Sequence, residues 1–229
     1  DNLGAQYNTG VLIETGSLRF NIVNCEFQAA IQTGVHNSAN YTTMINTRTL
    51  DSPIGVLSDS ASLFMYDCWG EQHDTWIDFT GTNLEVYNST LESVPMVTSP
   101  VGSPTIKVRS AYSVRFEGGD IDGPDPGANQ DNYIFDVDDI GSLLVTGIRS
   151  IRGTPLLTTT DTLSVEWSHT TGVYPGQDDD WTGVDDINRI RVHNVSSLSG
   201  AEREDRDWLP KFETIESKIY NSKHLISEM

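Results

Sequence analysis

The chain has 229 residues, with 33 aspartates and glutamates against 14 lysines and arginines, and its formal net charge is −19 at pH 7. A surface of this sign repels phosphate groups, so we expect no nucleic-acid partner. No apolar run approaches the roughly 18 residues of a transmembrane helix, so we expect no membrane insertion. The excess of acids over lysines is also typical of halophilic proteins, in which salt screens the self-repulsion.

A short apolar alternation recurs along the chain. Its second apolar residue returns every 20 to 30 residues, at Ile22, Ile45, Met65, Val86, Phe116, Val145 and Val165. Two residues after the first six of these stand residues that tolerate left-handed or tight-turn backbone, namely Asn24, Thr47, Asp67, Asn88, Gly118 and Gly147. A turn residue at one repeated phase predicts the corner of a structural repeat.

Each repeat contains two further apolar segments. A second inward column is predicted at Phe27, Leu50, Gly70, Leu91 and Ile121. A third strand begins near Ile54, Trp76, Ile106, Tyr133 and Pro155. Three short strands per repeat, with turn residues at the corners, predict an all-β fold, specifically a right-handed parallel β-helix of about seven coils.

The predicted β-helix covers 1–173, and the period fails after it. A linker and small strand-containing extension follows over 174–210. The spacing of a coiled-coil seam occurs at Phe212, Ile215, Ile219, Ser222, Ile226 and Met229, although Ser222 is polar. We expect a short helix over 211–229 that joins copies of the chain; the alternative is a helix that covers the end of its own solenoid.

The coils from about residue 10 to 173, with the pattern Leu-x-Val-x-Asn/Gly-x-x-Leu, resemble the pectate-lyase-like β-helices, especially viral tailspikes and their depolymerase relatives. The resemblance concerns the repeat architecture and includes no catalytic sequence motif. It implies a virion or extracellular location and a homotrimer closed by C-terminal elements. It also implies that the partners are host surface polysaccharide or glycoprotein and other virion proteins.

One outward column of the predicted coils is acidic. Six residues after each second anchor stand Gln28, Asp51, Glu71, Glu92 and Asp122. Successive coils separate such carboxylates by about 5 Å, and alternate coils by about 10 Å. These distances bracket the carboxylate separations of retaining and inverting glycosidases, so two of Asp51, Glu71, Glu92 and Asp122 are candidate catalytic residues. Bound Ca²⁺ and a solvated acidic face are the alternatives.

The outward column two residues earlier contains Glu26, Thr49, Trp69, Thr90, Asp120 and Arg149. We predict that Trp69 stacks on a sugar ring while Asp120 and Arg149 bond its hydroxyl groups. No metal-binding or nucleotide-binding sequence motif occurs, so we assign no metal ligands and expect no cofactor other than the Ca²⁺ alternative.

Three functions fit these features. The first is a virion tailspike or fibre-like protein that recognises a host glycan or surface layer through the outer face of the β-helix. The second is a polysaccharide depolymerase, a glycoside hydrolase that uses paired carboxylates. The third is a secreted or cell-surface β-helix protein with no viral connection.

Overall fold

In the computed structural model, residues 8–16, 18–92, 104–122, 133–152, 154–158, 162, 164–168, 170, 181–182, 189–193 and 218–220 are described. For Asp122, for 150–152 and for the strands beyond 153 other than 164–168, only the backbone is described. All regular structure in these ranges is β-strand. None of these ranges forms a helix with the length and apolarity that crossing a lipid bilayer requires. The predicted all-β class is confirmed.

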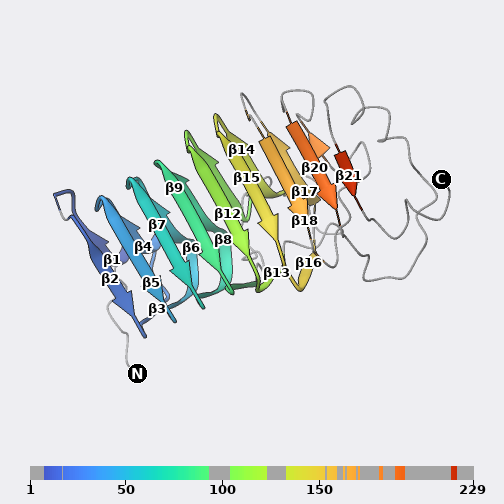
Figure 1. The fold of residues 1–229 in the computed structure, drawn as a ribbon. Helices are drawn as coiled ribbons and strands as arrows, with labels where there is room; N and C mark the ends of the chain where they lie inside the picture. The colour runs from blue at the N-terminus through green and yellow to red at the C-terminus, as the bar shows by residue number, and fades with distance from the viewer. Residues whose placement is uncertain are drawn as a thin grey trace.

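The described strands form two parallel sheets (Figure 1). The nine-stranded sheet has the order β2 (Phe20–Val23), β5 (Tyr41–Ile45), β7 (Ser62–Tyr66), β9 (Asn83–Tyr87), β12 (Ser113–Glu117), β15 (Ser142–Thr146), β18 (Ser164–Ser168), β20 (Arg189–His193) and β21 (Lys218–Tyr220). The main path of the twelve-stranded sheet has the order β1 (Thr9–Ile13), β4 (Thr33–Asn37), β6 (Arg48–Ser58), β8 (Trp69–Thr80), β11 (Ile106–Arg109), β14 (Tyr133–Asp138), β17 (Thr154–Thr158) and β19 (Trp181–Thr182).

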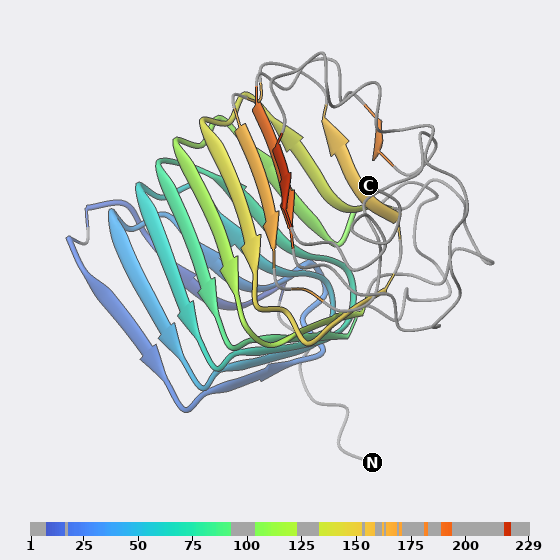
Figure 2. The same ribbon diagram turned by 45° about the vertical axis from the view of Figure 1, so that its right-hand side comes forward.

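A row of short strands branches from the twelve-stranded sheet. It contains β3 (Glu26–Gln28), β10 (Thr90–Glu92), β13 (Asp120–Asp122) and β16 (Ser150–Arg152). The long strands β6 and β8 connect it to the main path, because their first residues pair with β3 and β10 while their last residues pair with β4 and β11. We call the outer surface of β3, 48–50, 69–71, β10, β13 and β16 the short-strand face. Figure 2 shows the nine-stranded sheet in front of strands of the other sheet.

The corners after the nine-stranded sheet carry the residues that left-handed backbone requires. Positive φ angles occur at Asn24, Asn46, Asp67, Asn88, Gly118 and Gly147. Five of these six were predicted, and Thr47 is wrong by one residue. Asparagine adopts the left-handed conformation at a lower energetic cost than the β-branched threonine, so the chain turns at Asn46.

The same one-residue shift changes the second repeat. Met44, which is 0% exposed, pairs with Ile22 and Met65, whereas the predicted anchor Ile45 points outward and is 38% exposed. Because side chains alternate between the two faces of a strand, the shift also places Thr49 inside in place of the predicted Leu50. In the seventh repeat, Val145 pairs with Trp167, two residues after the predicted Val165.

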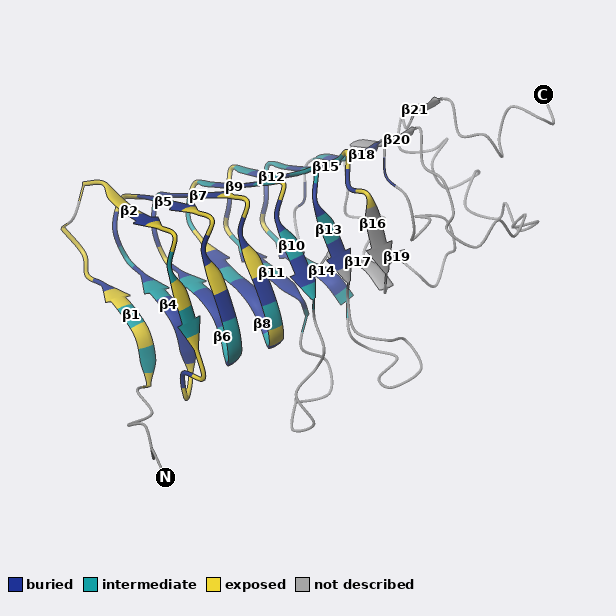
Figure 3. Cartoon of the chain, turned by 90° about the horizontal axis from the view of Figure 1, so that it is seen from below, coloured by how far each residue is buried: buried dark blue, intermediate teal, exposed yellow. Residues whose placement is uncertain are grey.

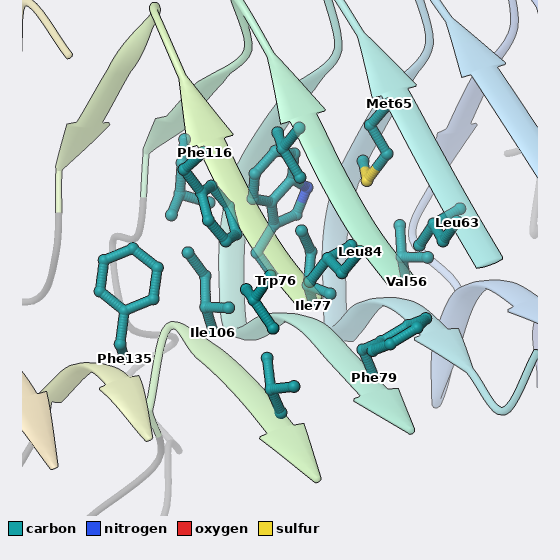
Figure 4. Packing of buried hydrophobic residues seen from close by; sticks show 14 of the residues in the cluster. Val56, Leu63, Met65, Trp76, Ile77, Phe79, Leu84, Ile106, Phe116 and Phe135 are labelled. Atoms are coloured by element: carbon teal, nitrogen blue, oxygen red, sulfur yellow. The ribbon is translucent and has the colours of Figure 1, made fainter. Parts of the chain in front are cut away.

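The core lies between the sheets and consists of side chains stacked along the repeats (Figure 4). In the twelve-stranded sheet, one inward column contains Val56, Ile77, Ile106 and Phe135, all 0% exposed. Phe135 contacts Phe116 edge to face, with ring centroids 5.0 Å apart. It contacts Trp167 in the same way at 5.8 Å. These aromatic contacts link the two sheets at the later repeats.

The predicted C-terminal helix over 211–229 is wrong in the part of this segment that the structure describes. Of this segment the structure describes Lys218–Tyr220, and these residues form β21, which pairs in parallel with β20. The edge of β20 has backbone N–H and C=O groups that need hydrogen-bond partners. A strand at Ile219 supplies these partners, whereas a helix forms its backbone hydrogen bonds within itself and supplies none. The rest of 211–229, like most of the predicted extension 174–210, lies outside the described residues.

Candidate functional site

The short-strand face presents two outward columns of side chains. One follows the paired positions Glu26, Arg48, Trp69, Thr90 and Asp120. The other follows Gln28, Leu50, Glu71, Glu92 and Asp122. The residues between them face the core, and Thr49, Gly70, Leu91 and Ile121 are buried. Figure 3 shows β10 and β13 of this face side by side, and β13 pairs in turn with β16.

The structure aligns the backbones of three of the four predicted catalytic residues in one column. Glu71 pairs with Glu92, and Glu92 pairs with Asp122. Their backbones therefore lie on successive levels of the stack, where one level is one strand of the sheet and levels are about 4.8 Å apart. Asp51 is not in this column, because the shifted register places Leu50 there. Asp51 instead has a φ of 53°, and its Oδ2 accepts a hydrogen bond from Gln28 Nε2 at 3.1 Å.

Arg48, which the sequence analysis did not single out, organises the first levels of the face. Its guanidinium lies 3.4 Å from a carboxylate oxygen of Glu26 and 3.7 Å from one of Glu71. Its Cζ lies 5.4 Å from the centroid of the Trp69 ring. Arg48 therefore contacts the indole of Trp69, a carboxylate of its own column at Glu26 and a carboxylate of the other column at Glu71. The one-residue shift at Met44 explains why sequence reasoning put Thr49 in this place.

Trp69 is the exposed aromatic residue of the short-strand face, with 36% of its surface accessible. Its neighbour on the next level is Thr90, whose side chain is much shorter than an indole. Arg48 lies over one side of the ring, and Thr90 is the residue paired with Trp69 one repeat later. An exposed, well-oriented indole of this kind offers an apolar surface to a ring-shaped ligand.

Asp120 and Arg149, both predicted to bond sugar hydroxyls, form an ion pair at 2.6 Å. Arg149 stands one residue before Ser150, which takes the place in the column that was predicted for Arg149. The Arg149 side chain is 72% exposed, so solvent screens this pair strongly. Its guanidinium reaches back to the Asp120 column and leaves one side accessible to ligand.

The described charges of the face are mostly negative. Glu26, Glu71, Glu92 and Asp120 supply carboxylates, and among the described side chains the guanidinium groups of Arg48 on the face and of Arg149 next to it are already paired. Among the described residues, Glu92 has no ion-pair partner. Such a face can accept hydrogen bonds from hydroxyl groups, while it repels anionic ligands.

The proposed Ca²⁺ stays a prediction. Within the described ranges no three or more His, Cys, Asp and Glu residues form a group that could hold a metal ion.

Beneath the face lies a buried polar cluster around His73, which is 1% exposed. Trp76 Nε1 donates to Thr49 Oγ1 at 3.2 Å, and Thr49 Oγ1 lies 3.0 Å from His73 Nε2. His73 Nδ1 lies 2.7 Å from the carbonyl oxygen of Ser52. His73 Nε2 also lies 2.7 Å from the carbonyl oxygen of Thr49, so each ring nitrogen faces a backbone acceptor and a neutral imidazole can donate to only one of them.

We expect the protein to lose stability as the pH falls below 6.5, partly through His73. Burial lowers the pKa of His73 below 6.5 and outweighs the carbonyl oxygens of Ser52 and Thr49, which raise it. Between the lowered pKa and 6.5 the unfolded chain binds more protons than the folded chain, so the contribution is full above pH 6.5 and is lost on acidification.

Urea unfolding across a pH series measures this effect. The His73→Gln variant should show a shallower fall in the free energy of unfolding below pH 6.5 than the wild type. His36→Gln, a change at a partly exposed histidine, is the matched control and should keep the wild-type slope. Equal slopes in the wild type and His73→Gln would contradict the assignment.

Comparison of the chain with family models, curated proteins and solved structures gave no match. The function is therefore argued from the chemistry of the short-strand face.

Proposed function

We propose that this protein is a right-handed parallel β-helix that binds a neutral glycan on its short-strand face. The observation that carries the proposal is the position of Trp69, an exposed indole held by Arg48 and bordered on the neighbouring column by Glu71 and Glu92.

The proposed fold rests on the pairing pattern. Each described strand pairs in parallel with its counterpart one repeat later, and the chain passes through three strands per repeat. Stacking of repeats in this way is how a parallel β-helix is built. The right hand is the one that parallel strand connections adopt in nearly all proteins.

A glycan matches this face chemically. The C–H face of a sugar ring is apolar and packs on an indole, while its hydroxyl groups donate to carboxylates around the ring edge. The side of Trp69 that faces Thr90 is the place for the ring, since Arg48 occupies the other side. Glu92 and Asp120 then flank the bound sugar from the neighbouring column and the next level.

The glycan is neutral because the face is acidic. The ligand has to approach several carboxylates on a chain whose net charge is −19. A uronate-rich or sialylated polymer would be repelled, and two guanidinium groups of the described side chains that could attract it, those of Arg48 and Arg149, are engaged with Glu26, Glu71 and Asp120.

The biological setting of this binding is a virion tailspike or fibre-like protein that recognises a host surface polysaccharide or glycoprotein. The resemblance of the repeat to viral tailspikes supports it, as does the elongated stack. A secreted or cell-surface β-helix of non-viral origin would use the same face in the same way.

Polysaccharide hydrolysis is the second candidate activity, and the pairing of Glu71 with Glu92 favours it. Two carboxylates on adjacent levels, about 4.8 Å apart at the backbone, approach the separation of about 5 to 5.5 Å found in retaining glycosidases. Their surroundings differ, since Glu71 has an ion pair with Arg48 whereas Glu92 has none among the described residues. An acid and a nucleophile need such different surroundings.

We expect Trp69→Ala to weaken glycan binding by roughly tenfold or more, because the variant loses the stacking surface. Titration calorimetry with neutral and uronate-rich surface polysaccharides measures this loss. Tyr112→Ala removes an aromatic side chain that is 76% exposed elsewhere, and it should bind like the wild type. Wild-type affinity in Trp69→Ala, or a preference for uronate-rich polymer, would overturn the proposal.

The same samples can be assayed for reducing ends. Hydrolysis that Glu92→Gln abolishes without loss of binding would establish the second candidate. Binding with no reducing ends released would leave recognition as the activity of this face.

A further inference from the structure

Two exposed aromatic side chains lie on either side of one corner of the stack. Tyr66 is the last residue of β7, Trp69 is the first residue of β8, and Asp67 between them has the positive φ of the corner, 51°. Tyr66 is 37% exposed and Trp69 is 36% exposed. Three residues of chain span at most about 11 Å, so the two rings start from backbone positions that one oligosaccharide can bridge.

This arrangement is particular to the third of the first five repeats. The residues at the two places in the other four repeats are Val23 and Glu26, Ile45 and Arg48, Tyr87 and Thr90, and Glu117 and Asp120. None of these pairs has an aromatic residue on both sides of its corner. The fold therefore does not require the pair at the third repeat.

Each of the two rings is held in one orientation by a neighbour. Tyr66 stacks on Tyr87 of the next repeat, with ring centroids 5.1 Å apart and planes 5° from parallel. Trp69 is contacted by Arg48 of the preceding repeat, whose Cζ lies 5.4 Å from the ring centroid. The held side of Tyr66 thus faces the later repeats, and the held side of Trp69 faces the earlier ones. A ligand would contact the opposite sides, and rings that are already oriented lose less conformational entropy on binding it.

The carboxylate between the two rings is available for hydrogen bonds. Asp67 is exposed, and among the described residues its carboxylate has no hydrogen-bond or ion-pair partner. In the same row of corners Asn46 Nδ2 donates to Asn24 Oδ1 at 2.8 Å, so those two side chains satisfy each other. Asp67 can instead accept hydrogen bonds from a ligand that lies across the corner.

The charges on the sheet next to the corner favour a neutral ligand with hydroxyl groups. The Tyr87 hydroxyl donates to Glu85 at 2.6 Å. Arg115 pairs with Glu117, so its guanidinium is engaged. An anionic ligand would be repelled by Asp67, and a purely apolar one would cover its carboxylate without supplying a hydrogen bond. A sugar meets both requirements, since its C–H face packs on a ring and its hydroxyl groups donate to a carboxylate.

We propose that the glycan site extends around this corner, so that one oligosaccharide contacts Trp69 on the short-strand face, Asp67 at the corner and Tyr66 on the nine-stranded sheet. This inference rests on the proposed function and extends it to a second surface. It sets a minimum ligand size, because a single sugar ring reaches only one side of the corner. Since the open sides of the two rings face opposite ends of the stack, the oligosaccharide crosses the corner obliquely.

Titration calorimetry tests this inference with a neutral polysaccharide that the wild type binds, and with short and long oligosaccharides prepared from it by partial hydrolysis. Tyr66→Ile removes the ring and introduces the residue type that stands at the paired position, Ile45. It should weaken binding of the long oligosaccharides by roughly tenfold and leave binding of the short ones unchanged. Tyr41→Ile is the matched control, because Tyr41 is 49% exposed at the far end of a neighbouring strand. It should bind both like the wild type.

A change at the corner itself gives an independent test. Asp67→Asn introduces a residue type that the corner accepts, since Asn46 and Asn88 have positive φ at the equivalent positions. It should weaken binding of the long oligosaccharides by roughly fivefold, because a neutral acceptor replaces a charged one. Asp139→Asn makes the same substitution at another exposed residue with positive φ and should leave binding unchanged.

Radical footprinting of the wild type with and without the polysaccharide needs no variant. Tyr66 and Trp69 should both become protected, whereas Tyr112, which is 76% exposed elsewhere, should stay reactive. Protection of Trp69 alone, or wild-type binding of the long oligosaccharides by Tyr66→Ile, would overturn the extension around the corner and leave the proposed function standing. Failure of the wild type to bind any neutral polysaccharide would overturn both.

Discussion

Gly70→Ala is expected to lower the free energy of unfolding by about 3 kcal/mol, at the upper end of the cost of overpacking a core. A methyl group at Gly70 would overlap the indole of Trp76, with its carbon 2.6 Å from Cε2 and closer still to Nε1 and Cδ1. The indole cannot move aside easily, because Trp76 is 2% exposed and its Nε1 donates to Thr49 Oγ1. The Trp76 indole therefore occupies the volume that a side chain at residue 70 would need.

A double-mutant cycle read by urea unfolding measures this pairing. Trp76→Ala alone should cost about 4 kcal/mol. In that background Gly70→Ala should cost little, which gives a coupling energy of about 2 to 3 kcal/mol. Additive effects of the two substitutions would show that another contact, and not the indole, excludes a side chain at Gly70.

Asn37→Ala is expected to destabilise the protein by about 3 kcal/mol, because it removes the acceptor of the buried Thr42 hydroxyl and of the Ala39 N–H. Asn37 is 0% exposed, and its Nδ2 donates to Ser58 Oγ at 2.9 Å. Its Oδ1 accepts from Thr42 Oγ1 at 2.7 Å and from the backbone N–H of Ala39 at 3.1 Å. The side chain thus ties the end of β4 to the start of β5 and to the next repeat.

Thermal and urea unfolding of Asn37→Ala can be compared with Asn40→Ala. Asn40 is an exposed asparagine three residues later, and its substitution should change stability by no more than about 0.5 kcal/mol. Similar losses in the two variants would show that the hydrogen bonds of Asn37 add nothing to the general effect of removing an asparagine from this turn.

Most of the repeat could be predicted because its signals are local. Asn24, Asp67 and Asn88 mark corners where only a few residue types accept positive φ. The alternating anchors at Met65, Val86 and Phe116 were likewise assigned to the correct face. The register of the second repeat was predicted wrongly by one residue. At the first inward position both Met44 and Ile45 are suitable side chains, and at the next both Thr49 and Leu50 are, so the sequence does not decide between the two registers.

That small ambiguity decided much of the candidate site. A shift of one residue exchanges inside and outside, so Asp51 was predicted in the carboxylate column and Arg48 was missed beside Trp69. Glu71, Glu92 and Asp122 were placed correctly in the backbone register, since their repeats contain no such ambiguity. The buried position of His73 was also missed, because its polar partners Thr49 and Ser52 belong to the preceding repeat.

An all-β stack of parallel strands could be predicted from the amino-acid sequence, because alternation and corner residues act within a few positions of the chain. Tertiary structure alone decided which side chains meet across levels, such as Arg48 with Glu71 and Gly70 with Trp76. It also decided that Lys218–Tyr220 adds a strand to the sheet and does not continue a helix. These outcomes depend on the volumes, charges and unpaired backbone groups of segments distant in the chain, which no local pattern contains.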